Sequence, residues 1–357
     1  MSARCGAIVP GVAAAVGAMA VLGSASAAVG PDAARTFLAD AFGLTEADFT
    51  RLDRGLVVSR TLPATDKREV ATLGVVRVAM TPEFYVEQLS DIANLKQDEA
   101  ILQIGTFGDP PSVRDVAELT LDDSDIRSLR QCKVGDCGVQ LSADAIDRFR
   151  EEIDWDHRDA STRANSLMRL ILVEYVSRYM KEGPAASMKY ADELEPLDVW
   201  REFVSLAGPD AAGWQQFPLL LRHLFEYPAA PASDTTDLLY WSKERIGRKG
   251  VASVTHLAIA RVAAVSPADY AVASKQIYGM HYYEASLGLT ILLRDRSAPS
   301  PATYLVYVNR SRVDVFGGIF GGLVRKVVTG RARSTVADQL EGLQDTLQGR
   351  FCRTRPC

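Results

Sequence analysis

Between residues 252 and 313 the sequence carries four consecutive runs of apolar and β-branched residues, which constrain the fold more than any other feature. The runs read ASVTHLAIARV, DYAVASKQIYG, HYYEASLGLTILL and ATYLVYVNRSRV, and the turn-like segments SPAD and RSAPSPA interrupt them. Runs of this kind, bounded by Pro, Ser and Asp, are typical of β-strands joined by short connections. The sequence therefore predicts a series of antiparallel strands here.

The N-terminal part adds a helix, a strand pair, a second helix and a further strand. Residues 31–54 are predicted to be helical, starting at Pro31 and Asp32. GLVVSRTL and REVATLGVVRVAM read as two strands separated by PATDK. In TPEFYVEQLSDI, Thr81 is a suitable N-cap and Pro82 fits the first helical position. AILQIGTFGDPP predicts the strand that follows.

The middle of the chain, from about 112 to 247, changes to a helical period. Its clearest helical stretches are SADAIDRFREEI, STRANSLMRLILVEYVSRYMKEG, LDVWREFVSLAG and WQQFPLLLRHLFEYP. A last helical region starts at GGIFGG and is expected to be capped again after Gly330 by Ser334 or Thr335. Its apolar side consists of Val336, Leu340, Leu343 and Leu347.

The first residues predict export. Arg4 precedes the apolar run GAIVPGVAAAVGAMAVLG, and Ala25 and Ala27 occupy the −3 and −1 positions of an A-x-A cleavage site. Removal of 1–27 leaves 330 residues, enough for one large domain or two small ones. The net charge of −5 is mildly acidic, whereas a nucleic-acid-binding protein needs a basic face, so no nucleic-acid partner is indicated. We expect a periplasmic or secreted protein.

The remaining cysteines predict disulfides, because an even number in an exported chain is typical of cross-linking. They are Cys132, Cys137, Cys352 and Cys357. Local closure of 132 with 137 and of 352 with 357 is the simplest of three connectivities. A zinc site made by the two C-x4-C pairs, and free thiols, are the alternatives; the pairs lack a nearby histidine.

The order of these elements predicts an α+β fold in which a curved antiparallel sheet grips a long C-terminal helix. The predicted segments are a signal peptide (1–27), an N-terminal helix with the first part of the sheet (28–111), a mostly helical insertion (112–247), the late strands with the C-terminal helix (248–349) and a cysteine-containing tail (350–357).

This order resembles the helix-grip fold of the START lipid-transfer domains and the wider polyketide-cyclase-like superfamily. VVRVAMTPEFYVEQLSDI matches the strand and first helix of that fold, and FGGLVRKVVTGRARSTVADQLEGLQDTL matches its closing helix. The resemblance covers about 55–105 and 250–349, and departs from the family in the helical insertion. It implies a cavity between sheet and helix that holds a lipid, sterol or polyketide-like molecule, with membrane-surface contact during ligand exchange.

The late strands supply the candidate site. Polar side chains expected to orient a hydrophobic ligand are Lys275, Tyr278, His281, Tyr283, Tyr307 and Asn309. If 274–293 is one straight strand, His281 and Tyr283 share its apolar face and Glu284 lies on the other; a turn near Gly279 would change this. An enzyme that uses His281 as acid or base is the first alternative function. The second is an interaction module built on the helices at 161–182 or 217–227, with an unnamed protein partner.

No metal ion or cofactor is predicted. DWDHRD lacks the glycine and distal glutamate of a calcium loop and reads as a helix start. GGIFGGLVRK, followed by Arg331 and Arg333, is not a phosphate-binding loop, although an anionic head group remains an alternative there. The sequence contains neither G-x-S-x-G nor H-E-x-x-H, so hydrolase chemistry has no signature.

Overall fold

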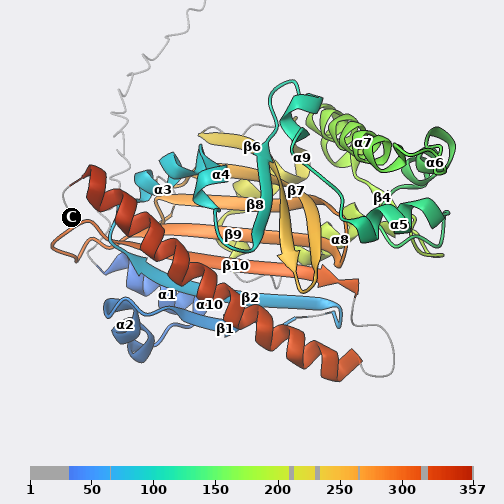
Figure 1. Cartoon of the computed structure of the whole chain (residues 1–357). Helices are drawn as coiled ribbons and strands as arrows, with labels where there is room; N and C mark the ends of the chain where they lie inside the picture. The colour runs from blue at the N-terminus through green and yellow to red at the C-terminus, as the bar shows by residue number, and fades with distance from the viewer. Residues whose placement is uncertain are drawn as a thin grey trace, which may run out of the picture.

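The computed structural model describes residues 32–355 apart from 65, 209–212, 230–233, 264–265 and 315–320, and apart from the side chains of 321–326. The predicted signal peptide therefore lies outside the described residues. The described chain forms an eight-stranded antiparallel sheet in the order β1-β2-β10-β9-β8-β7-β6-β3 (Figure 1). The strands are β1 (Val58–Thr61), β2 (Glu69–Val78), β3 (Ile101–Thr106), β6 (Thr235–Ile246), β7 (Lys249–Arg261), β8 (Tyr270–Gly279), β9 (Tyr283–Arg294) and β10 (Thr303–Val313), with β4 (Lys189–Tyr190) and β5 (Leu197–Asp198) in a separate pair.

Helices cover both faces of this sheet. They are α1 (Ala33–Phe42), α2 (Glu46–Asp53), α3 (Pro82–Leu89), α4 (Ile92–Leu95), α5 (Asp123–Gln131), α6 (Ala143–Glu152), α7 (Ala160–Glu182), α8 (Val199–Leu206), α9 (Pro218–Glu226) and α10 (Gly321–Thr354). We call the face that packs against α3, α4 and α10 the grip face. The opposite face packs against α1, α2, α8 and α9, with α6 and α7 at its far end, and we call it the helix-rich face.

The predicted fold class is confirmed, because the early strand pair and the late strands belong to one sheet. β2 pairs along its whole length with β10, for example Val76 with Leu305. Alternation along β2 sends Leu73 and Val75 to the helix-rich face and Val76 to the grip face. The sheet is therefore buried on both sides where these strands lie.

α10 crosses the grip face over β2 and β1 (Figure 1). Gly74 permits this close approach, since a Cβ at that position would collide with Leu340 and lie 2.7 Å from Val336 Cγ1. The predicted capping near Gly330 was wrong, because α10 continues without a break from Gly321 to Thr354. The buried contacts of Val336, Leu340, Leu347 and Phe351 stabilise it along the sheet.

Two further sequence assignments require correction. Residues 31–54 form two helices, because Gly43 adopts a left-handed conformation (φ 64°) that ends α1, and Thr45 caps α2 in a capping box with Asp48. The helical period predicted up to 247 is wrong in its last part, because 235–246 forms strand β6, joined to β7 by a tight turn at Gly247 (φ 61°). The hydrogen-bonded partners on β3 and β7 override the helical interpretation.

The predicted disulfide between Cys132 and Cys137 is confirmed, and it closes the segment after α5. Cys352 is also disulfide-bonded, while its predicted partner Cys357 lies outside the described residues. None of the helices in the described ranges combines the length and apolar character that a membrane crossing needs.

Candidate functional site

Three ligand-type side chains converge beneath the helices of the helix-rich face. The Nε2 atoms of His223 and His256 both lie 2.8 Å from the same oxygen, Oδ1 of Asp237. Both imidazoles are buried, whereas 24% of the Asp237 side chain is exposed to solvent. We call these three residues the His–Asp–His cluster. The cluster is therefore shielded from solvent except at the Asp237 carboxylate.

Local structure explains why these residues meet. In α9, Pro218 occupies the first turn, and Leu220, His223 and Leu224 are its buried residues, spaced as one helix face. In the sheet, Leu239 of β6 stands opposite His256 of β7. Asp237, two residues before Leu239, is therefore a diagonal neighbour of His256 on the same face.

Aromatic residues hold the His256 ring from its other side. The hydroxyl of Tyr179, on α7, lies 2.9 Å from His256 Nδ1. Tyr227, which directly follows α9, lies with its ring 4.4 Å from the His256 ring and stacks on Tyr179 at 5.4 Å. The orientation of the imidazole is thus fixed by a hydrogen bond and by packing.

Lys275 extends the polar region along the next strand. It stands opposite His256 in the register of β7 and β8, and its side chain is buried. Its Nζ makes no hydrogen bond within the described part of the chain. Instead it lies over the rings of Phe203 (4.4 Å), Trp200 (4.7 Å) and Tyr179 (5.3 Å). Among the described residues, these cation–π contacts with three aromatic rings are the only interactions that offset the burial of the amine.

Burial and hydrogen bonding shift the pKa values of these groups. Burial lowers the pKa of Lys275 to about 7, so its amine is largely neutral in mildly alkaline solution. Burial also lowers the pKa of His256, against the opposing effect of Asp237. For Asp237, burial alone would raise the pKa, but the hydrogen bonds and charges of His256 and His223 outweigh it and lower the pKa.

A second polar region lies on the grip face. Lys96, just after α4, donates to Glu244 Oε1 (3.1 Å) and to the Tyr240 hydroxyl (3.3 Å), both on β6. Burial opposes the charge on Lys96, but Tyr240 and Glu244 outweigh it and raise its pKa. Both residues are half-buried, with 33% of the Lys96 side chain and 29% of the Glu244 side chain exposed to solvent.

Three of the six predicted ligand-binding residues belong to this region. Asn309 Nδ2 donates to the Tyr307 hydroxyl and to Ser286 Oγ, each at 3.2 Å. Burial raises the pKa of Tyr283 to about 12, and electrostatic interaction with Glu244 and Tyr307 adds to the shift. Tyr283, Tyr307 and Asn309 are all half-buried. They form a polar strip on an otherwise apolar sheet face.

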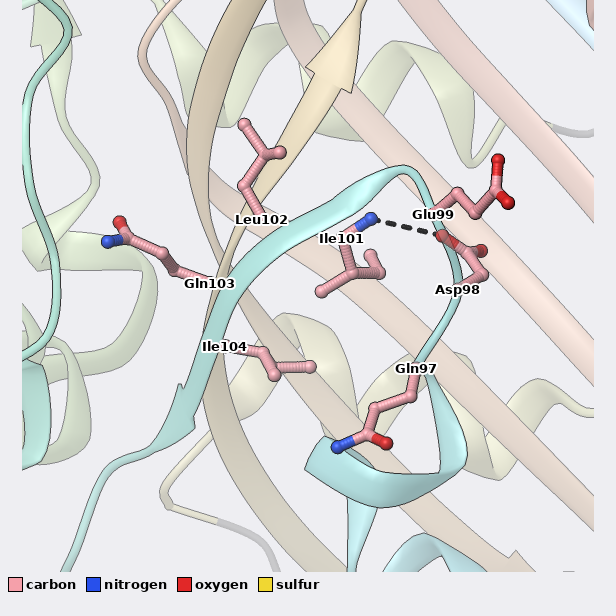
Figure 2. Close-up of a pocket in the computed structure, with 7 residues that line it drawn as sticks. All are labelled: Gln97, Asp98, Glu99, Ile101, Leu102, Gln103 and Ile104. Carbon is pink, nitrogen blue, oxygen red and sulfur yellow. Dashed lines mark hydrogen bonds between the residues drawn. The ribbon is translucent and has the colours of Figure 1, made fainter.

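An open hollow of about 610 Å³ adjoins this region at the edge strand β3. Figure 2 shows Ile101 and Ile104 on one side of the β3 ribbon and Leu102 and Gln103 on the other. Ile104 lines the hollow and also packs against the apolar cluster of the grip face. The hollow and the grip face therefore share a wall.

The other three predicted residues lie elsewhere, because the straight-strand assumption was wrong. A turn at 280–282, with Tyr282 at φ 65°, separates β8 from β9. It places His281 against the helical insertion, where its Nε2 lies 3.0 Å from Asp125 Oδ1 and both groups are buried. Tyr278 packs edge-on against Tyr190 in the same core. Lys275 faces the helix-rich side.

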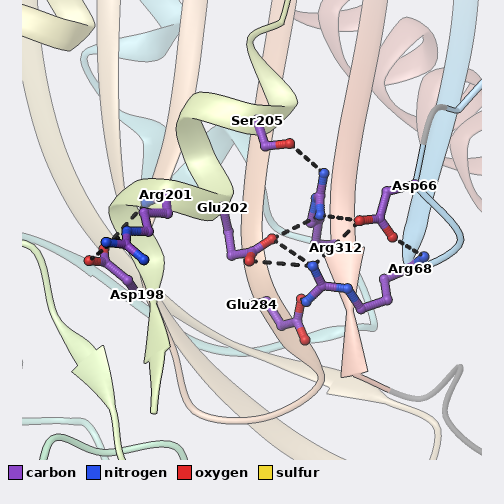
Figure 3. Close-up of polar contacts among 8 residues, drawn as sticks. All are labelled: Asp66, Arg68, Asp198, Arg201, Glu202, Ser205, Glu284 and Arg312. Atoms are coloured by element: carbon purple, nitrogen blue, oxygen red, sulfur yellow. Dashed lines mark hydrogen bonds and ion pairs between the residues drawn. The ribbon is translucent and has the colours of Figure 1, made fainter. Parts of the chain in front are cut away.

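A network of charged residues fastens α8 to the sheet at the far end of β9 and β10. Its members are Asp66, Arg68, Glu202, Ser205, Glu284 and Arg312 (Figure 3). Arg312, only 4% exposed, donates to Ser205 Oγ on α8 at 2.6 Å and pairs with Glu202 at 3.0 Å. Glu284 pairs with Arg68 and not with His281. The network therefore fixes α8 on the sheet, where Trp200 and Phe203 of this helix cover Lys275.

Comparisons with known proteins add nothing to this geometry: no family model, curated protein or solved structure matches the chain.

Sequence analysis missed Lys96, Tyr240, Glu244 and the His–Asp–His cluster. Asp237, Tyr240 and Glu244 lie on β6, which the sequence pattern assigned to the helical middle of the chain. A usable signal was present, because TTDLLYWSKERI is followed at once by Gly-Arg and another β-branched run, as in a tight hairpin.

Proposed function

We propose that the chain binds a hydrophobic or amphipathic small molecule over the grip face. The observation that carries this proposal is the polar strip of Tyr283, Tyr307 and Asn309 on an otherwise apolar sheet face, together with the partly exposed Lys96–Glu244 ion pair on the same face. Half-buried polar side chains among apolar ones are accessible to a ligand and can orient it. An apolar lining with a few placed polar groups is typical of ligand sites.

The surrounding residues suit an amphipathic molecule. Partly buried apolar side chains on β3, β6, β7 and β8 continue the core toward this region: Ile104, Leu238, Ile259 and Tyr270. They would bury the apolar part of a ligand, with a gain of roughly 25 cal/mol per Å² removed from water. Lys96, Tyr307 and Asn309 would orient its polar end.

The order of elements supports a finer assignment within the same proposal. A sheet that grips one long C-terminal helix is compatible with the helix-grip fold. We infer that the chain is a remote helix-grip protein with a helical insertion, and that it is exported. The Cys132–Cys137 disulfide supports export, because such bonds persist in oxidising compartments. Ligand exchange would then take place at a membrane surface.

The test is a titration of the delipidated full chain with a fluorescent fatty acid and a fluorescent sterol, preceded by native mass spectrometry for co-purified cargo. Ser274 is half-buried on the grip face, and its Oγ sits above Gly288 beside Tyr307. Ser274→Phe should occupy the space beside Tyr307 on the grip face and weaken probe binding at least about tenfold, or 1.4 kcal/mol.

Thr61→Phe, at the exposed end of the edge strand β1, is the matched control and should leave the affinity unchanged. Flat titrations of the wild-type protein with both probes would contradict the proposal. Equal loss in both variants would show that the aromatic substitution acts without regard to the site.

A further inference from the structure

We propose that His223, Asp237 and His256 bind one divalent transition-metal ion of the zinc class on the helix-rich face. This inference is independent of ligand binding on the grip face, because its donor atoms belong to the opposite side of the sheet.

The donor set has the chemistry of a three-ligand metal site. Its ligand atoms, two imidazole nitrogens and one carboxylate oxygen, all lie within 4.8 Å of one another. Imidazole and carboxylate together suit zinc and neighbouring divalent metals, and sites with three protein ligands keep a position for water or substrate. A nitrogen and an oxygen donor, each at 2.0–2.2 Å from a tetrahedral ion, are about 3.4 Å apart. The observed 2.8 Å spacings would therefore open by about half an ångström on binding.

The elements and side chains that surround the three ligand residues favour a preorganised site. The three ligands come from three separate elements, α9, β6 and β7, so the core positions them independently. Tyr179 holds the remaining ring nitrogen of His256 at 2.9 Å, the outer-shell contact that fixes a metal-binding imidazole. Tyr227 packs against the same ring.

Access comes from the carboxylate side. Both histidines are enclosed, but Asp237 is about a quarter exposed, so an ion would enter past its side chain and keep its open position toward solvent. The competing explanation is a hydrogen-bond network in which Asp237 Oδ1 accepts an N–H from each imidazole. Both explanations use the same three atoms, and only metal titration separates them.

The experiment uses the full chain after chelator treatment, titrated with ZnCl2 by calorimetry and with CoCl2 by visible absorption. We expect one equivalent of Zn²⁺ with a Kd below about 1 µM, an increase in Tm on addition of Zn²⁺, and the absorption of a low-symmetry Co²⁺ site. Asp237→Asn keeps the side-chain shape and should weaken Zn²⁺ binding more than about 100-fold, since loss of outer-shell partners alone costs 10–100-fold.

His157→Gln is the matched control. His157 is exposed and lies beside Asp159 in the DWDHRD segment, so it reports adventitious zinc binding by a histidine among carboxylates. It should leave the stoichiometry and the affinity unchanged. Absence of Zn²⁺ binding by the wild-type chain overturns the proposal in favour of the hydrogen-bond network, and this readout requires no variant to fold. Retention of full affinity in Asp237→Asn, or its loss in His157→Gln, would also overturn it.

Discussion

The two faces of the sheet differ in how deeply they bury adjacent residues of the same strand. On β8, Ser274 is half-buried on the grip face, whereas Lys275 is enclosed under α8 on the helix-rich face. On β7, Thr255 and His256 likewise point to opposite faces, although both are buried. The helix-rich face also carries small residues that let the helices approach closely: Ala258, Ala260, Ala271, Ala273 and Ala285. One strand thus contributes to an accessible surface and to a sealed polar core.

The largest effect is expected at Lys275, because the helix-rich face buries its amine without a counter-ion. Its pKa of about 7 lies below the unfolded value of about 10.4, a difference that corresponds to roughly 5 kcal/mol. Below pH 7 the amine is protonated in both states, so the native state is destabilised by the full desolvation cost of the buried charge. Between pH 7 and 10.4 only the unfolded state holds it, so the free energy of unfolding rises with pH.

Lys275→Met should therefore stabilise the protein by several kcal/mol at pH 6, and the gain should shrink toward pH 10. Urea denaturation at pH 6, 7.5 and 9 with chelator present measures this difference. Ser274→Ala, one residue away on the grip face, should change stability by less than about 0.5 kcal/mol at each pH. If Lys275→Met raised the free energy of unfolding equally at every pH, the helix-rich face would not bury a titrating amine, and the contrast between the faces would be wrong.

An intermediate effect is expected where α10 packs most closely on the grip face. Gly74→Val places branched carbons where Val336 and Leu340 already lie, and overpacking of this kind destabilises by about 1–3 kcal/mol. Chemical denaturation measures the loss. An unchanged free energy of unfolding would mean that α10 packs loosely, and that the grip face is open along its whole width.

The smallest effect is a gain on the outer side of the same helix. Gly342 lies within α10 and is exposed, and a Cβ added to it would meet no other atom within 4 Å. Gly342→Ala should stabilise the protein by about 0.5–1 kcal/mol, because glycine loses more backbone freedom in a helix than alanine does. Thermal denaturation checks this increase. A decrease would indicate that this side of α10 is covered by another surface.

The sequence was sufficient for features that depend on local patterns. The strand pair before Thr81, the helix that Thr81 caps and the Cys132–Cys137 bridge follow from spacing and capping chemistry. Features that depend on distant partners were not predictable in the same way. The directions of Tyr278 and His281 depend on the register shift between Val254 and Thr255, opposite Ile277, and on the turn after Gly279. A one-residue shift of this kind sends each following side chain to the other face.

The pairing of β2 with β10 has a consequence for how the protein acquires its structure. Residue 69 of β2 pairs with residue 312 of β10, so β1 and β2 cannot join the other six strands until nearly the whole chain has been synthesised. Contacts this remote in sequence slow folding, because the intervening chain must be ordered before they form. The first two strands of a nascent chain therefore wait for the last strand, β10, before the sheet is complete.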